Sequence, residues 1–178
     1  MIRVSENIIL KPILNSDTKT LFQLMKEIYP LAYSHFWEDK GAWYLNSQYS
    51  EKNILKELSQ KNTDYYFVIY KNEIIGNFRI IWDAKLDGLS IKRQVKLHRL
   101  YLHQKIHGKG IGKQLVSWLE EKSKHKNYKA IWLDTMDTKL QAFEFYKNLG
   151  YQYQSHVFLN FELMHDEVRK MSQVYKKL

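Results

Sequence analysis

Residues 95–121, VKLHRLYLHQKIHGKGIGKQLVSWLEE, run from an extended pattern through three closely spaced glycines into an apolar helical pattern. Gly108, Gly110 and Gly112 are three of only seven glycines in the chain. The order predicts a strand over 92–103, a glycine turn and then a helix. A strand that leads through glycines into a helix is a recurring phosphate site, because free amides and the helix dipole favour an anion there.

Two familiar nucleotide motifs do not fit these glycines. The dinucleotide fingerprint needs two residues between its second and third glycines, and here there is one. The P-loop needs Ser or Thr after its lysine, and Gln114 follows Lys113. The glycines can instead bring a phosphate close to the backbone, with Lys109 and Lys113 adding charge. A flexible connection without a ligand stays open as the alternative.

Composition indicates one packed domain. The chain has 178 residues, of which 44% are hydrophobic and 15% aromatic, with only two prolines. The net charge of +9 favours an anionic partner, which could be a phosphate-bearing cofactor, nucleic acid or an acidic surface. Because the lysines and arginines are scattered along the chain, most of them are expected on a solvated face and not on a nucleic-acid track.

The chain has no cysteine, which excludes thiol nucleophiles and thiolate metal sites and fits a reducing compartment. The sequence contains no export-type leader and no run of about 18 apolar residues. We therefore expect a cytoplasmic protein with no membrane partner. His103 and His107 are four residues apart but flank a strand end and the glycine turn, so we expect no metal site.

The other patterns alternate between strands and helices. A helix over 16–29 should begin at Ser16 or Asp17 and end at Pro30, and a second helix should begin at Ser50. The remaining expected elements are a strand over 6–13, an irregular or short helical stretch over 31–48, a hairpin over 64–82, a strand over 129–136, a helix over 138–151 closed by Gly150, one or two strands over 152–164 and a short helix over 165–178.

Two linked motifs carry a family resemblance. The glycine stretch and IWLDTMDTKLQAFEFYKNLGYQ at 131–152 together resemble the core of the GCN5-related N-acetyltransferase (GNAT) superfamily. In that superfamily the fourth strand, an R/Q-x-x-G-x-G/A loop and its helix bind acetyl-CoA, and an A-x-x-F-Y-x-x-x-G-F/Y helix lies beside the thioester. Here these elements are LHRLYL, HGKGIG and AFEFYKNLGY. The resemblance covers roughly Val95–Tyr153.

The resemblance implies a mixed α/β fold with a central, mostly antiparallel sheet of six to seven strands flanked by helices. It implies a single acetyltransferase domain over 1–178, with the acceptor-binding helices and hairpin in 1–92 and the acetyl-CoA-binding half in 93–178. Acetyl-CoA would be the acyl donor. The cofactor-binding residues implied are Leu100, Tyr101, Leu102, His107, Gly108, Lys109, Gly110, Ile111, Gly112, Lys113, Lys139, Phe143 and Tyr146.

Two positions depart from the family pattern. His107 replaces the Arg or Gln that usually opens the glycine motif, and Lys139 stands where the family often has Asn. Both changes weaken the transfer of side-chain roles from the family. They leave the backbone amides untouched, and an added lysine near a phosphorylated cofactor is favourable. Cofactor binding is therefore still expected.

The resemblance also implies direct transfer from the thioester to an amine, with backbone amides near Leu100, Tyr101 and Leu102 holding the carbonyl oxygen. Tyr146 would protonate the departing thiolate, although helical spacing alone allows it to be a core residue. His98 is our candidate for the base, because histidine titrates near neutrality. Glu38, Asp83 or a chain of waters are the alternatives.

The acceptor is expected to be a small primary amine such as a polyamine. The aromatics of LAYSHFWEDKGAWYLNSQYS at 31–50 could form its wall, and Glu38 and Asp39 could attract a cation. The alternatives are a peptide or protein N-terminus or lysine, or a non-catalytic acyl-CoA-binding regulator. A nucleic-acid-binding domain would not explain the glycine stretch or the AFEFYKNLGY helix. An edge strand near 156–163 could pair with a second copy to give a homodimer.

Overall fold

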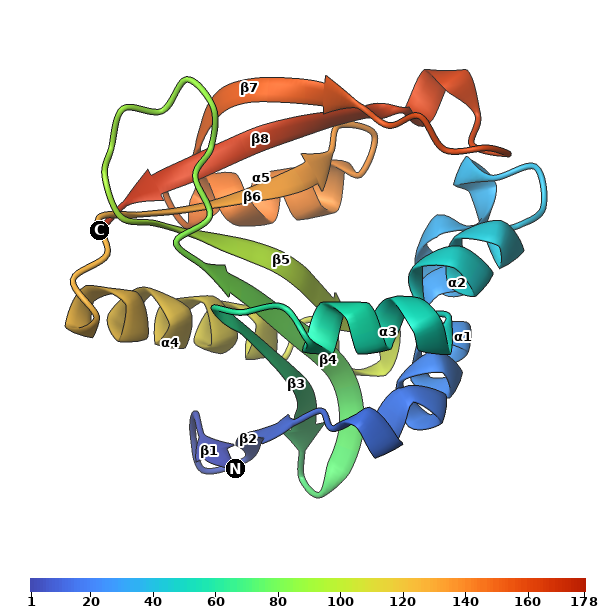
Figure 1. Cartoon of the computed structure of the whole chain (residues 1–178), viewed down its shortest axis with the longest axis horizontal. Coiled ribbons are helices and arrows are strands. Elements are labelled where there is room, and N and C mark those ends of the chain that lie inside the picture. The colour runs from blue at the N-terminus through green and yellow to red at the C-terminus, as the bar shows by residue number, and fades with distance from the viewer.

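The computed structural model describes residues 1–178 as one eight-stranded sheet with helices on both faces (Figure 1). The strand order is β1-β2-β3-β4-β5-β6-β8-β7, and every neighbouring pair is antiparallel except β5 and β6. The strands are β1 (Ile2–Arg3), β2 (Ile8–Pro12), β3 (Thr63–Tyr70), β4 (Glu73–Trp82), β5 (Gln94–Leu102), β6 (Ala130–Met136), β7 (Gln152–Phe158) and β8 (Lys170–Lys177). The helices are α1 (Thr18–Tyr33), α2 (Ala42–Gln48), α3 (Glu51–Leu58), α4 (Ile111–His125) and α5 (Leu140–Asn148).

The mixed α/β class is confirmed, with one strand more than the expected six to seven. The predicted hairpin is β3 and β4, joined by the two residues Lys71 and Asn72, which both have positive φ as a type I′ turn requires. Ser50 caps α3 by accepting the Asn53 amide. Asp17 is the N-cap of α1, and Gly150, with φ 88°, follows α5 as a left-handed residue.

Two predictions about the elements are wrong. The segment expected as a C-terminal helix is strand β8, which is inserted between β6 and β7. Burial of Ser172 and Val174, two residues apart, is the period of a strand. Pro30 does not end α1, which continues to Tyr33. A proline removes one backbone donor, and stacking of Tyr33 on Tyr29 at 5.0 Å between ring centroids favours the added turn.

The strands divide the interior into two apolar clusters. Tyr66 and Val68 of β3 join the cluster beneath α4, whereas Tyr65 and Phe67 join the cluster beneath α1, α2 and α3. Alternate residues of a strand point to opposite faces, so one strand contributes to both clusters. In Figure 1, α4 lies at the lower left, and α1, α2 and α3 are grouped at the right.

The site is positioned by the divergence of β5 and β6. These strands pair only where residues 94–96 face residues 130–132. Next along β5, the pairing with β4 shifts by one residue so that His98 is the extra residue of a bulge. Beyond that point β5 has no partner on its β6 side, and a space opens between the two strands.

None of the five helices combines the length that a membrane span requires with the necessary apolar character.

Candidate active site

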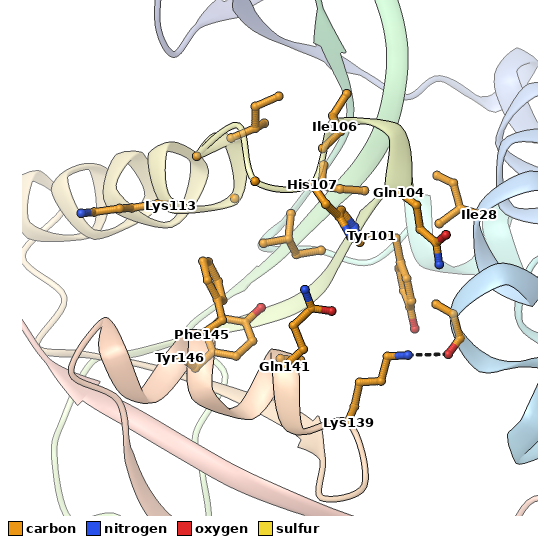
Figure 2. A pocket seen from close by; sticks show the side chains of 18 of the residues that line it. Ile28, Tyr101, Gln104, Ile106, His107, Lys113, Lys139, Gln141, Phe145 and Tyr146 are labelled. Carbon is orange, nitrogen blue, oxygen red and sulfur yellow. Dashed lines mark hydrogen bonds between the residues drawn. The ribbon is translucent and has the colours of Figure 1, made fainter.

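Two cavities meet where β5 and β6 diverge. The first, which we call the loop cavity, has a volume of about 430 Å³ and lies between the glycine turn, α5 and the end of α1 (Figure 2). Most of the residues expected to bind the cofactor line it. They are Leu100, Tyr101, Leu102, His107, Gly108, Gly110, Ile111, Gly112, Lys113, Lys139 and Tyr146.

The glycine turn leaves backbone amides free at the mouth of the loop cavity. Gly108 and Gly110 have φ values of 77° and 71°, a region that side chains disfavour, and no atom lies within 4 Å of where their Cβ atoms would stand. The first backbone bond of α4 is donated by Gln114 to the Gly110 carbonyl. The preceding amides of this helix therefore have no backbone partner and can receive an anion.

Gly112 has different surroundings, because a Cβ there would be in ordinary van der Waals contact with the Phe145 ring at 3.4 Å. Phe145 of α5 therefore packs beside the first turn of α4, and it lines the loop cavity together with Gln141. Phe143, which we expected there, packs instead against the apolar cluster under α4. The sequence carried a signal for this, since Ala142, Phe145 and Tyr146 lie at spacings typical of one helical face.

The charged residues near the turn differ in their placement. His107 and Lys113 line the loop cavity, but Lys109 does not, and its ammonium lies 5.8 Å from the centre of the Tyr70 ring. The Lys139 ammonium donates a hydrogen bond of 2.6 Å to the Ala32 carbonyl, shown as the dashed line in Figure 2. Burial lowers the pKa of Lys139. This lysine therefore ties the start of α5 to the end of α1.

The second cavity, which we call the aromatic cavity, has a volume of about 270 Å³ and lies on the other side of the divergence. It shares part of its wall with the loop cavity, so the two spaces are adjacent. The shared residues are Tyr33, Leu100, Tyr101, Ala142 and Tyr146. A molecule in each cavity would meet its neighbour at these side chains.

Tyr146 lies at this junction with a hydroxyl that forms no hydrogen bond to another residue, and its ring lies 5.6 Å from the ring of Tyr151. Burial, with a smaller contribution from Tyr33, raises the pKa of Tyr146 above its usual value. The hydroxyl therefore keeps its proton at neutral pH. A protonated, unpartnered hydroxyl between two cavities suits a general acid.

His98 lines the aromatic cavity but does not have the environment of a base. Its Nδ1 atom lies 2.6 Å from Nη1 of Arg79, and since a guanidinium only donates, Nδ1 accepts this hydrogen bond. Burial is the largest of the effects that lower the pKa of His98 to about 2, followed by the charges of Arg99, Arg79 and Lys96. The prediction that His98 takes the proton from the amine does not fit this environment.

The alternative side-chain bases lie elsewhere. Neither Glu38 nor Asp83 lines either cavity. Asp134 is the only carboxylate in the wall of the aromatic cavity, and its two oxygens are engaged by Lys96 at 2.6 Å and by Gln173 at 3.0 Å. No three His, Asp or Glu side chains are grouped as metal ligands would be.

Buried charge beneath the aromatic cavity was not predicted from the sequence. Arg79, Arg99 and Glu57 are all buried, and the Glu57 carboxylate lies 2.8 Å from Arg99 and 3.7 Å from Arg79. Arg99 also donates to the Tyr65 hydroxyl at 3.2 Å. The pairing of strands β3, β4 and β5 and the packing of α3 bring these residues together, so no local sequence pattern predicts the cluster.

The sequence comparisons agree with this site. The sequence model of the Acetyltransferase (GNAT) family matches residues 21–151, and the chain belongs to this family. It is an acetyl-CoA-dependent N-acetyltransferase. It is 24% identical over 119 residues to an uncharacterized N-acetyltransferase in the pepI 3′ region of Lactobacillus delbrueckii subsp. lactis, covering 66% of this chain and 69% of that protein.

Solved structures share the fold across nearly the whole chain. One is the PaiA N-acetyltransferase of Thermoplasma acidophilum in complex with coenzyme A, with a TM-score of 0.72, 19% identity and coverage of 96% of this chain and 99% of that one. Another is the spermidine/spermine N-acetyltransferase SpeG of Vibrio cholerae, in mutant forms, with a TM-score of 0.65, 14% identity and coverage of 97% and 95%.

The residues of the loop cavity fit acetyl-CoA. The open space above Gly108 and Gly110, which a Cβ would fill, and the free amides of α4 suit a pyrophosphate. Lys113 is part of the wall, but its side chain extends along α4 away from the glycine turn (Figure 2). When bound, acetyl-CoA supplies an activated acyl group as a thioester. The route from the glycine turn past Phe145 to Tyr146 leads from the helix terminus to the junction of the two cavities.

Proposed function

We propose that this enzyme transfers the acetyl group directly to a primary amine of a small molecule that binds in the aromatic cavity. The observation that carries the proposal is the position of Tyr146, whose free hydroxyl lies where the loop cavity and the aromatic cavity meet. The transfer forms one N–C bond and breaks one C–S bond. The amine loses a proton, and the Tyr146 hydroxyl donates a proton to the departing sulfur.

Backbone amides of β5 are suited to hold the carbonyl oxygen. The His103 amide donates to the Ile75 carbonyl of β4. Successive amides of a strand point in opposite directions, so the amides of Leu102 and Leu100 point away from β4 toward the opened side. Amides fixed by a strand need no rearrangement as charge develops on the oxygen. We propose that they form the oxyanion hole.

We propose that the proton of the amine leaves through water and not through His98. The hydroxyls of Tyr44 and Tyr101 form a hydrogen bond of 3.1 Å beside the aromatic cavity and could orient such a water. His98 then stays neutral and carries its proton on Nε2, because Nδ1 accepts from Arg79. Its role would be to donate a hydrogen bond within the cavity.

A polyamine, the acceptor expected from the sequence, is one candidate. The fold shared with a spermidine/spermine acetyltransferase is compatible with it. However, the acidic residues that we expected to attract a cation do not line the aromatic cavity: Asp39 accepts the Gly41 amide at the start of α2, and Glu38 is exposed. The general proposal is therefore limited to a primary amine.

The test is thiol release from acetyl-CoA, followed with a thiol-reactive dye, across polyamines, aromatic amines, aminoglycosides, amino acids and peptide N-termini. The absence of cysteine means that the protein gives no background signal. We expect release with at least one class of small amine. Release only with peptides or protein lysines would contradict a small-molecule acceptor. Binding of acetyl-CoA without release from any of these small amines would also contradict the proposed acceptor class.

A further inference from the structure

We infer that the acceptor is an amine with an aromatic body, such as an arylalkylamine, and that its ring binds against the wall of the aromatic cavity. This inference rests on the proposed function. Rings from three separate segments form the wall: Tyr29 on α1, Tyr44 on α2 and Phe161 in the connection between β7 and β8. A flat apolar group has the largest contact with such a surface.

The rings form a continuous set. Tyr29 stacks on Tyr44 with centroids 4.2 Å apart and an angle of 11° between the planes. Trp37 and Phe161 are 6.0 Å apart at 25°, and Tyr44 lies 6.2 Å from Phe161. Offset and edge-to-face contacts of this kind stabilise an aromatic group beyond the effect of the area that it buries. The aromatic ring of an acceptor would add one more contact of the same kind to these side chains.

The charges of the cavity oppose a polycation. A polyamine brings one or two ammonium groups in addition to the nitrogen that reacts, and each needs a partner when it leaves water. The only carboxylate in the wall, Asp134, already forms hydrogen bonds or an ion pair through both oxygens. Arg99 is the cation in the wall. An amine with a single nitrogen avoids this cost.

The part of the wall that contains Phe161 is held in place by one side chain. The guanidinium of Arg169 donates to the carbonyls of Leu159 at 3.0 Å, Phe161 at 2.9 Å and Met164 at 2.7 Å. The same connection pairs with the segment before α2 through a bridge between Trp37 and Met164. The loop is therefore a fixed wall of the cavity, and its aromatic residue can select an acceptor.

The experiment compares 2-phenylethylamine, hexylamine and spermidine at saturating acetyl-CoA. We expect kcat/KM for 2-phenylethylamine to exceed that for the other two by roughly tenfold or more, and Phe161→Ala to remove most of this preference. The matched control is Phe22→Ala, which removes a half-buried ring of α1 that lines neither cavity. Equal or better use of spermidine, or an unchanged preference in Phe161→Ala, would overturn the inference.

Calorimetric titration of 2-phenylethylamine into the protein with coenzyme A separates this inference from the proposed function. Thiol release without an aromatic preference would leave the transferase proposal intact and refute the aromatic acceptor. Binding that is lost in Phe161→Ala but kept in Phe22→Ala, with no release from any amine, would support the aromatic site and refute the proposed transfer. If 2-phenylethylamine is neither bound nor acetylated, the inference is refuted.

Discussion

Arg79 and His98 face each other across the β4–β5 pairing, with 2.6 Å between Nη1 of the arginine and Nδ1 of the histidine. The contact removes the lone pair that a base would use. It also fixes the position of the proton on the other ring nitrogen. His98 is therefore not suited to act as the base, although it lies on the strand next to the reacting groups. Because His98 stays neutral in the folded protein, the stability of the protein should depend on pH.

We expect His98 to make the enzyme sensitive to acid. Its pKa in the folded protein is about 2, whereas in the unfolded chain it returns to about 6.5. Between these values the unfolded chain binds a proton that the folded protein does not, so stability falls as the pH falls below about 6.5. Urea unfolding at pH 7 and pH 5 should show that His98→Gln loses less free energy of unfolding over this interval than the unmodified protein. The difference should be on the order of 1–2 kcal/mol.

The control for this measurement is His156→Gln, since His156 is exposed on β7. This variant should lose as much stability between pH 7 and pH 5 as the unmodified protein does. An equal acid sensitivity of His98→Gln and the unmodified protein would show that His98 takes up a proton in the folded state. His98 would then again be a candidate for the base.

Gly110→Ala should weaken acetyl-CoA binding. The left-handed conformation, with φ 71°, costs a side chain roughly 1–2 kcal/mol, and the added methyl would occupy space next to the free amides of α4. We expect a loss of affinity of about tenfold or more by calorimetry. Gly88→Ala is the matched control, because Gly88 has φ 74° and lies outside both cavities. It should lose similar stability and no affinity.

Tyr146→Phe should lower kcat and leave the dissociation constant of acetyl-CoA unchanged. The loss of a general acid is worth about 10²- to 10⁴-fold in rate. Because burial raises the pKa of Tyr146, the unmodified enzyme should show no loss of this acid up to pH 10. Tyr153→Phe, a change at an exposed tyrosine of β7, is the control. A normal kcat in Tyr146→Phe would mean that water protonates the thiolate.

We expect the protein to self-associate through β7. This strand is at the edge of the sheet and exposes Tyr153, Val157 and Phe158. An exposed edge with apolar side chains is a template for pairing with another strand, and a lysine on the edge opposes such pairing. Sedimentation should give a dimer for the unmodified protein and a monomer for Val157→Lys. A monomer in both cases would refute the homodimer.

The parts of the site that could be predicted are those whose signal is local. The turn at Gly108 and Gly110, the helix after it and the face that carries Tyr146 each follow from residues within a few positions of one another. The aromatic wall could be predicted only in part, because Phe161 reaches Trp37 and Tyr44 through the packing of distant segments. The family motif identifies the cofactor site and carries little information on the acceptor.

The errors in the predicted fold have the same origin. Strand β8 gains its hydrogen bonds from β6 and β7, and its sequence alone has too short a pattern to exclude a helix. The pairing of Arg79 with His98 depends on the bulge in β5, and no sequence pattern predicts that bulge. Where an element or a side chain depends on a partner far along the chain, local periodicity cannot predict it.

The insertion of β8 between β6 and β7 has a consequence for synthesis on the ribosome. β7 leaves the ribosome before β8, yet β8 is its only partner in the sheet. Until β8 emerges, β7 has no neighbour and β6 lacks one of its two. The nascent chain therefore exposes unpaired strand edges until β8 has emerged, and during this interval chaperone contact or pairing between chains on one polysome competes with completion of the sheet.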